Sequence, residues 1–194
     1  MIESYDTSVL GWRFFLWWML AFLGIPVGGY IAFELVGPVE GVVSGAMAGA
    51  LAGVVIGAAQ WLVLRRFMDV GMAWVVATAV GVATGDALGA WLTAAGTEIR
   101  DLLVVGLVTG VAVGFSQWML LKGHVPAANL WVPVATAAWP VGWAVTWAAG
   151  IDVERGYAMF SASGALVFAA ITVVAIWLMS RGGIRAALHW SSAR

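Results

Sequence analysis

The chain has 194 residues, of which 63% are hydrophobic and 10% are charged, and its formal net charge is −1. An average soluble domain carries about 25% charged residues, and a chain of this length cannot hide so much apolar surface from water. Composition therefore excludes a soluble globular enzyme, a disordered tail and a basic nucleic-acid-binding protein, and predicts a protein that folds in lipid.

Six long apolar segments follow one another along the chain. Each is near or above the roughly 20 residues that cross about 30 Å of hydrocarbon as a helix. Five of them contain no charged residue, and the third contains one, Asp86. The segments show no alternation of polar and apolar residues, which argues against β-barrel strands. The expected spans are 14–33, 41–64, 70–97, 102–121, 123–151 and 156–180.

The distribution of Lys and Arg predicts the orientation of the chain. If the N-terminus lies in the cytoplasm, seven basic residues are cytoplasmic and two, Arg100 and Arg155, lie outside beside acidic neighbours. Both termini are then cytoplasmic. The 13 Trp residues fall mainly near the ends of the expected spans, as in the aromatic belts at membrane interfaces. The predicted cytoplasmic basic residues are Arg13, Arg65, Arg66, Lys122, Arg181, Arg185 and Arg194.

A shift of 57 residues aligns the chain with itself. Trp17 falls on Trp74 and Trp131, and Gln60 falls on Gln117. The third copy needs two extra residues and carries Ile176 where the others carry Gln. We therefore expect an all-α integral membrane protein whose six helices form three parallel repeats of a two-helix hairpin, with a possible pseudo-threefold axis. The repeats cover about 10–66, 67–123 and 124–181 of a single domain, and 182–194 form a cytoplasmic tail.

The second helix of each of the first two repeats carries three Gly residues at intervals of four, followed by Gln and Trp. This spacing places the glycines and the Gln on one helix face, where a neighbouring backbone can approach closely. Gln60 and Gln117 either bridge helices, for about 0.6–2 kcal/mol each, or line a polar cavity open to the cytoplasm. The predicted packing glycines are Gly49, Gly53, Gly57, Gly106, Gly110 and Gly114.

Proline and glycine residues predict local departures from straight helices. Pro26, Pro133 and Pro140 lie within the odd-numbered spans and should kink them. The kinks either create a cavity or only shape the bundle. Gly182 and Gly183 follow the last span and predict that its helix ends there.

Asp86 is the acidic residue well inside a span. A carboxylate at the centre of a membrane helix costs about 2.5–3.5 kcal/mol, so Asp86 should be neutral, hydrated, or bonded to Thr and Trp donors. Its repeat equivalents are Gly29 and Trp143, so the acid is not required by the repeat. Asp86 is therefore either a proton or cation site or a buried acid held by a hydrogen bond. It shares a helix face with Ala79, Ala83, Ala90, Thr93 and Thr97.

Catalytic and metal sites find little support in the sequence. No cysteine is present, and His124 and His189 lie outside the spans, so a metal or haem site is not expected. Ser161 has no His at membrane depth to activate it. We expect no catalytic residue, no bound metal and no cofactor.

The pattern G-x3-G-x2-Q-W-x2-L-[R/K] occurs at 53–65 and 110–122, and weakly at 169–181. In this pattern the chain resembles uncharacterised bacterial multi-pass membrane proteins, which implies a bacterial inner-membrane location but no activity. The expected function is a non-enzymatic scaffold or accessory protein that binds lipids, a membrane-protein partner or a second copy of itself. The alternative is a small transporter or channel that uses Asp86 as a proton or cation site.

Overall fold

The computed structural model describes residues 11–191, apart from the side chains of 154 and 181–191, and this part of the chain is helical without strands. The all-α prediction is confirmed. The first helical run combines α1 (Trp12–Leu20), a 3₁₀ turn (Ala21–Leu23) and α2 (Gly24–Val36). The others are α3 (Val42–Leu64), α4 (Ala73–Thr93), α5 (Ile99–Leu121), α6 (Trp131–Ala148) and α7 (Ala162–Ser191), with short 3₁₀ turns at Ala128–Leu130 and Val153–Arg155.

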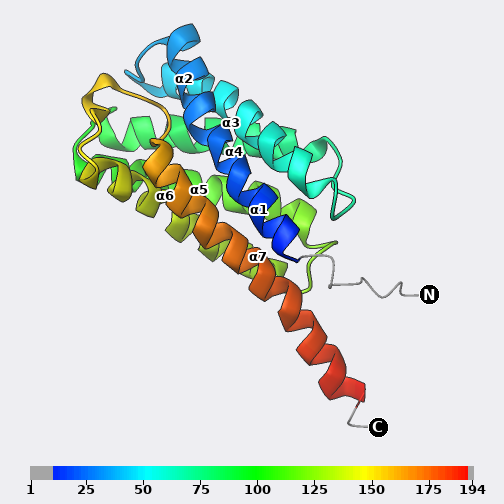
Figure 1. Ribbon diagram of the computed structural model, residues 1–194. Coiled ribbons are helices and arrows are strands. Elements are labelled where there is room, and N and C mark those ends of the chain that lie inside the picture. Colours follow the sequence, from blue (N-terminus) through cyan, green and yellow to red (C-terminus); the bar gives the residue numbers. More distant parts are fainter. Residues whose placement is uncertain (1–10, 192–194) are drawn as a thin grey trace.

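The helices run up and down, and each packs against its neighbours in the sequence (Figure 1). The most extensive contacts join α3 to α4, α4 to α5 and α5 to α6. The last helix, α7, also contacts α1, the 3₁₀ turn and α2, which closes the helices into a ring. The interface between α7 and the first helical run, here called the seam, is less extensive than the others.

Five of the six helical runs are long and apolar enough to cross a membrane. They are Trp12–Val36, Val42–Leu64, Ala73–Thr93, Ile99–Leu121 and Ala162–Ser180. The expected fifth span is the exception, because α6 has 18 residues and includes Trp, Thr and Pro residues that lower its hydropathy. An α-helix of that length still rises about 27 Å.

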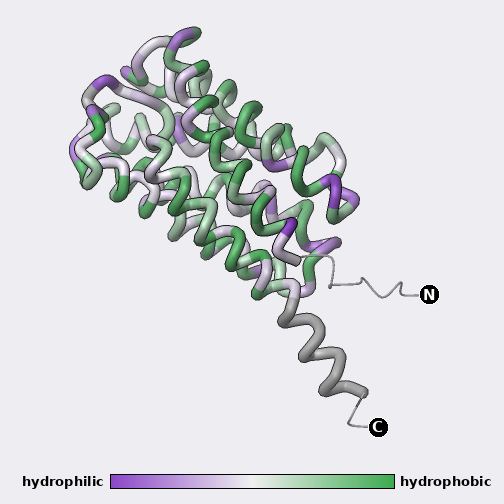
Figure 2. The backbone as a smooth tube through the Cα atoms, in the orientation of Figure 1, coloured by the Kyte–Doolittle hydropathy of each residue, from purple (hydrophilic) through white to green (hydrophobic). Residues whose placement is uncertain are grey.

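The outer faces of the helices are apolar, as expected for a surface that meets lipid. Val43, Leu35 and Trp91 are each about 70% exposed, at 72%, 70% and 68%. Large apolar residues are exposed on every helix from α1 to α7. Hydrophilic segments gather mainly at the two ends of the bundle (Figure 2). Contiguous apolar surface on this scale is not tolerated by soluble monomers.

The two ends of the bundle differ in charge. One end, here called the basic end, carries Arg13 and the loops 65–72 and 122–130, which meet where Asp69 O lies 2.9 Å from His124 Nε2. The other end, here called the acidic end, carries the loops 37–41, 94–98 and 149–161. There the Val39 N–H donates to Gly156 O at 2.9 Å.

The predicted packing glycines lie between neighbouring helices. The glycines of α3 face α4: a Cβ on Gly53 would stand 2.6 Å from the Cα of Ala79. Those of α5 face α6, where a Cβ on Gly110 would stand 2.6 Å from the carbonyl oxygen of Ala135. Real side chains do not approach a backbone so closely, so these helix pairs require glycine at their contacts. The corresponding contacts at Gly49, Gly57, Gly106 and Gly114 are slightly longer, at 2.8–3.0 Å.

The prolines and the C-terminal glycines differ in effect from the prediction. Pro26 lies one turn after the 3₁₀ residues Ala21–Leu23, where its missing N–H and its ring disturb the α-helical pattern. Pro133 is in the first turn of α6, where a proline costs little, and Pro140 lies inside that helix. The predicted stop at Gly182 and Gly183 is wrong, because α7 continues to Ser191. An isolated glycine pair lowers helix propensity by about 1 kcal/mol per residue without preventing a helix.

Candidate functional site

Gln60 of α3 and Gln117 of α5 meet in the interior and form a polar layer with Thr78, Trp74 and Trp131. Gln117 Nε2 donates to Gln60 Oε1 at 3.1 Å and to Thr78 Oγ1 at 2.9 Å. Trp74 Nε1 donates to Gln60 Oε1 at 3.1 Å, and Trp131 Nε1 donates to Gln117 Oε1 at 3.0 Å. We call these five residues the Gln layer. It joins α3, α4, α5 and α6.

The Gln layer is buried, and hydrogen bonds within it pair both carboxamide oxygens, the Gln117 amide nitrogen and the two indole N–H groups. Gln60 and Gln117 are 5% and 1% exposed, and Thr78 is fully buried. No buried polar side-chain atom in these five residues lacks a partner. The cavity that borders Gln60 measures about 10 Å³, which is about the least that one water occupies. The layer therefore bridges helices, and Gln60 also borders this small cavity, whose other lining residues are apolar apart from the Trp18 indole.

Trp18, Trp74 and Trp131 lie near the ends of the expected spans, but their side chains are buried and do not face an interface. They are 2%, 0% and 1% exposed, whereas Trp17 is 44% exposed and lies under the Arg66 guanidinium at 4.5 Å. Trp18 Nε1 donates to Thr172 Oγ1 of α7 at 3.0 Å. These three indoles can be buried because each finds an acceptor on the adjacent helix.

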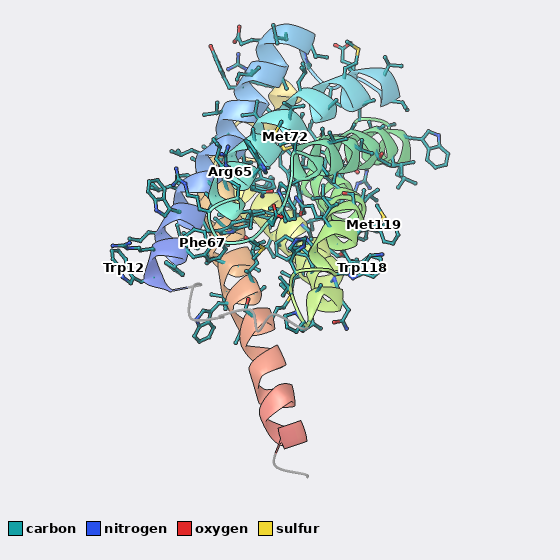
Figure 3. The ribbon with its side chains drawn as sticks, turned by 90° about the vertical axis from the view of Figure 1, so that its right-hand side faces the viewer. Trp12, Arg65, Phe67, Met72, Trp118 and Met119 are labelled. Atoms are coloured by element: carbon teal, nitrogen blue, oxygen red, sulfur yellow. The ribbon has the colours of Figure 1, made fainter. Side chains whose placement is uncertain are left out.

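Other Trp residues do lie at the periphery, as predicted. Trp61 and Trp118 stack under Arg65 and Lys122, with 4.6 and 5.3 Å between the cation and the ring centroid. Figure 3 shows Trp12 and Trp118 at the outer edges of the bundle, on α1 and α5. A basic side chain above a partly buried indole suits the headgroup region of a membrane.

Asp86 lies in the interior near the acidic end and is 3% exposed. Its Oδ1 accepts a hydrogen bond from Thr109 Oγ1 of α5 at 3.0 Å. Its Oδ2 is buried without a partner and faces Gly49 of α3, where a Cβ would stand 3.0 Å away. A buried acceptor left unpaired costs about 1–3 kcal/mol, and more when it is charged. The Thr donor was expected, but half of the carboxylate remains unsatisfied.

Asp86 also lines a cavity of about 40 Å³, here called the Asp86 cavity. Ala90 and Thr93 of α4 and Thr97 of the following loop border it too, whereas Ala79 and Ala83 of the predicted face contact Gly53 and Gly49 of α3. Asp86 is the one charged residue among the described residues of the lining, which also include Val39, Ala95, Gly96, Leu102, Val105, Trp143, Val153, Gly156, Tyr157 and Ala158.

All three loops of the acidic end contribute to the Asp86 cavity. Val39 comes from the first, 95–97 from the second and 153–158 from the third. The second loop reverses through two left-handed residues, Ala94 and Ala95, with φ of 50° and 57°. Alanine in this conformation costs about 1–2 kcal/mol relative to glycine. The loop that covers the cavity is therefore held in a strained turn.

A second cavity, of about 250 Å³, lies between α2, α6 and the loop 149–161 that leads into α7. Its lining is mostly apolar, with Tyr30 and Tyr157 among its polar residues. Thr146 and Ser161 also line it, and their hydroxyl groups lie 3.1 Å apart. Ser161 and Ser163 bond each other at 2.8 Å, and no base activates either among the contacts of the described residues. The described residues contain no group of three or more His, Cys, Asp or Glu that could hold a metal ion.

The structure thus separates the predicted site residues into two groups. Gln60 and Gln117 contact each other in the Gln layer, while Asp86 lies toward the acidic end with Thr109. Sequence reasoning missed the indole partners of the Gln residues. The signal was present as a Trp 14 residues after each Gln.

No family model, curated protein or solved structure matches the chain. The resemblance to bacterial multi-pass membrane proteins therefore stays a prediction, and the function rests on the geometry alone.

Proposed function

We propose that the chain is a non-enzymatic multi-pass membrane protein that acts as a scaffold or accessory protein, binding lipids or a partner within the bilayer. The observation that carries this proposal is the filled centre of the bundle. The Gln layer links four helices by hydrogen bonds and leaves no fully buried polar atom unpaired, and glycine contacts bring neighbouring helices together. The surface left for recognition is the apolar outer face, which suits lipid or another membrane helix.

A threefold repeat of helical hairpins underlies this architecture in our proposal. Two equivalent contacts support it. Trp74 bonds Gln60 of the preceding helix just as Trp131 bonds Gln117. Trp18 of the first helix bonds Thr172 of α7, which precedes it around the ring. Thr172 lies one turn before Ile176, the residue that replaces Gln in the third copy.

The first repeat takes its buried Trp from position 18 rather than the aligned position 17, and the 3₁₀ turn accounts for this. Trp18 lies six residues before Gly24, whereas Trp74 lies seven before Gly81. Three of those six residues are 3₁₀ (Ala21–Leu23), so the segment rises about 10.5 Å, the same as seven residues of α-helix. The Trp and the Gly therefore keep the same separation along the helix axis.

The orientation in this proposal puts the basic end in the cytoplasm and the acidic end outside. Arg65, Arg66 and Lys122 at the basic end stack on Trp rings, a pairing suited to anionic headgroups. Both termini are then cytoplasmic, and the resemblance favours the inner membrane of a bacterium.

The scaffold proposal is tested by assembly in the membrane. Differently tagged copies are coexpressed, and the purified protein is analysed for bound lipid and for copurifying copies. Gly53→Leu and Gly110→Leu should abolish assembly because each adds a side chain where a Cβ alone already meets the neighbouring backbone at 2.6 Å. Asp86→Asn should leave assembly intact. Loss of assembly in Asp86→Asn with retention in both Gly variants would overturn the proposal.

Transport or channel activity at Asp86 is the second candidate function. The unpaired Oδ2 and the Asp86 cavity favour it. A path across the bundle is obstructed below the cavity by the Gln layer and by buried apolar residues such as Val82 and Trp139. This candidate predicts flux in liposomes that depends on pH or voltage and disappears in Asp86→Asn. Absence of flux for protons, alkali cations and small solutes would contradict it.

A further inference from the structure

The Asp86 cavity combines a buried carboxylate with a space that no protein atom fills. Asp86 is 3% exposed. Thr109 donates a hydrogen bond to Oδ1, whereas Oδ2 has no hydrogen-bond partner. The Gln layer, by contrast, leaves no buried polar atom unpaired. Asp86 therefore has bonding capacity that the protein itself does not use.

The size of the cavity limits what can bind there. At about 40 Å³, it accommodates about three water molecules or one compact ion. Apolar residues such as Leu102 and Val105 form much of the wall. A large organic ligand does not fit without movement of the three loops.

The chemistry of the lining selects a cation of single charge. Asp86 supplies one negative charge, and no cationic residue is among the described residues of the lining. Thr93 donates its hydroxyl hydrogen to Gly89 O, which leaves the oxygen free to accept. Ca²⁺ and Mg²⁺ require about six or more oxygen ligands, usually with several carboxylates, and this site lacks them. Trp143 and Tyr157 also line the cavity, and the Tyr157 ring already has the Arg155 guanidinium 5.7 Å from its centroid.

Charge at the acidic end favours entry from that side. The helix ends and loops there carry six acidic residues against two arginines, and Arg100 already contacts Glu98 at 3.2 Å and Asp101 at 3.4 Å. An excess of one charge around an opening raises the local concentration of counter-ions. The acidic residues are Glu34, Glu40, Glu98, Asp101, Asp152 and Glu154.

We propose that the Asp86 cavity binds a small monovalent cation, of alkali or methylammonium size, that enters from the acidic end and is held by the Asp86 carboxylate. The proposal is independent of the scaffold function and gives the second candidate function its ligand class. The cation can bind without crossing the protein, because the Gln layer lies between the cavity and the basic end.

The test is calorimetric titration of the full-length protein in detergent micelles with NaCl, KCl and methylammonium chloride. N-methylglucamine serves as an oversized cation and maintains ionic strength. The expected result is saturable binding of at least one small cation and none of N-methylglucamine. Asp86→Asn should weaken binding by about thirtyfold or more, the effect of removing one partner of a buried charge pair.

Two further variants separate the site from general effects. Ala90→Leu fills the cavity without changing charge and should also abolish binding, since Ala90 is 3% exposed and lines the space. Asp152→Asn removes an exposed charge of the acidic end and should change affinity by less than about threefold. Gel filtration and circular dichroism establish that each variant is folded.

The outcomes distinguish this inference from the functions above. Saturable binding that requires Asp86 and the open cavity supports it, whether or not liposomes show flux, and binding without flux rejects the transporter alone. No saturable binding to the wild-type protein, or equal binding to Asp86→Asn, overturns the inference and leaves the scaffold proposal standing.

Discussion

Replacement of Gln117 by leucine tests the role of the Gln layer most directly. Gln117 donates to Gln60 and Thr78 and accepts from Trp131, so the leucine variant loses all three bonds at once. Hydrogen bonds between membrane helices contribute about 0.6 kcal/mol each on average and up to about 1.7 kcal/mol. The Trp131 N–H is then left buried without an acceptor, which alone costs about 1–3 kcal/mol. We expect a total loss of about 2–4 kcal/mol.

The assay is reversible unfolding in mixed micelles, followed by circular dichroism. Ser116→Ala is the matched control, because the neighbouring Ser116 Oγ bonds only the Val113 carbonyl of its own helix. Its effect should stay within about 0.5 kcal/mol. In a double-mutant cycle, Trp131→Phe should cost less in the leucine variant than in the wild type, because its acceptor is already gone. A loss below about 0.5 kcal/mol for Gln117→Leu, or strict additivity in the cycle, would refute the reasoning.

Three further predictions concern packing, the first repeat and topology. Gly53→Ala should lower the free energy of unfolding by about 1–3 kcal/mol, because a Cβ at Gly53 meets Ala79. Gly123→Ala should lower it by under about 1 kcal/mol, because a Cβ there meets nothing within 4 Å. Equal effects of the two substitutions in thermal unfolding would contradict this. Trp18→Phe should cost about 1–2 kcal/mol through loss of the bond to Thr172, and the exposed Trp17→Phe almost nothing. In intact cells, an impermeant thiol reagent should label Gly150→Cys but not Gly123→Cys; the reverse pattern would invert the proposed orientation.

The helical spans were predictable because lipid imposes a simple rule. A backbone in hydrocarbon must satisfy its own hydrogen bonds, so long apolar segments become helices. The observed α3 and α5 begin and end within about three residues of the expected spans. The expected 123–151 span was wrong in extent, because the loop before α6 runs to a 3₁₀ turn at Ala128–Leu130 and helix begins only at Trp131.

The interior contacts were less predictable because they depend on pairs of residues. Trp favours interfaces in general, and only an acceptor at the right depth on the next helix makes its burial favourable. The separation of 14 residues from Gln60 to Trp74, and again from Gln117 to Trp131, carried that information. No local pattern could have shown that residues 153–158 cover Asp86, since that contact joins distant parts of the chain.

The seam has a consequence for how the protein is made. Each helix up to α6 packs chiefly against the one synthesised just before it, so every new span finds its partner as it leaves the ribosome. Docking of α7 onto α1 and α2 is the one step that must await the whole polypeptide. Ala165, Ala169 and Val173 stand there in place of the glycines of the other interfaces. A chain truncated before α7 would insert and pair its earlier helices, but Trp18 would be exposed. The final helix therefore acts as a clasp that closes the ring of helices.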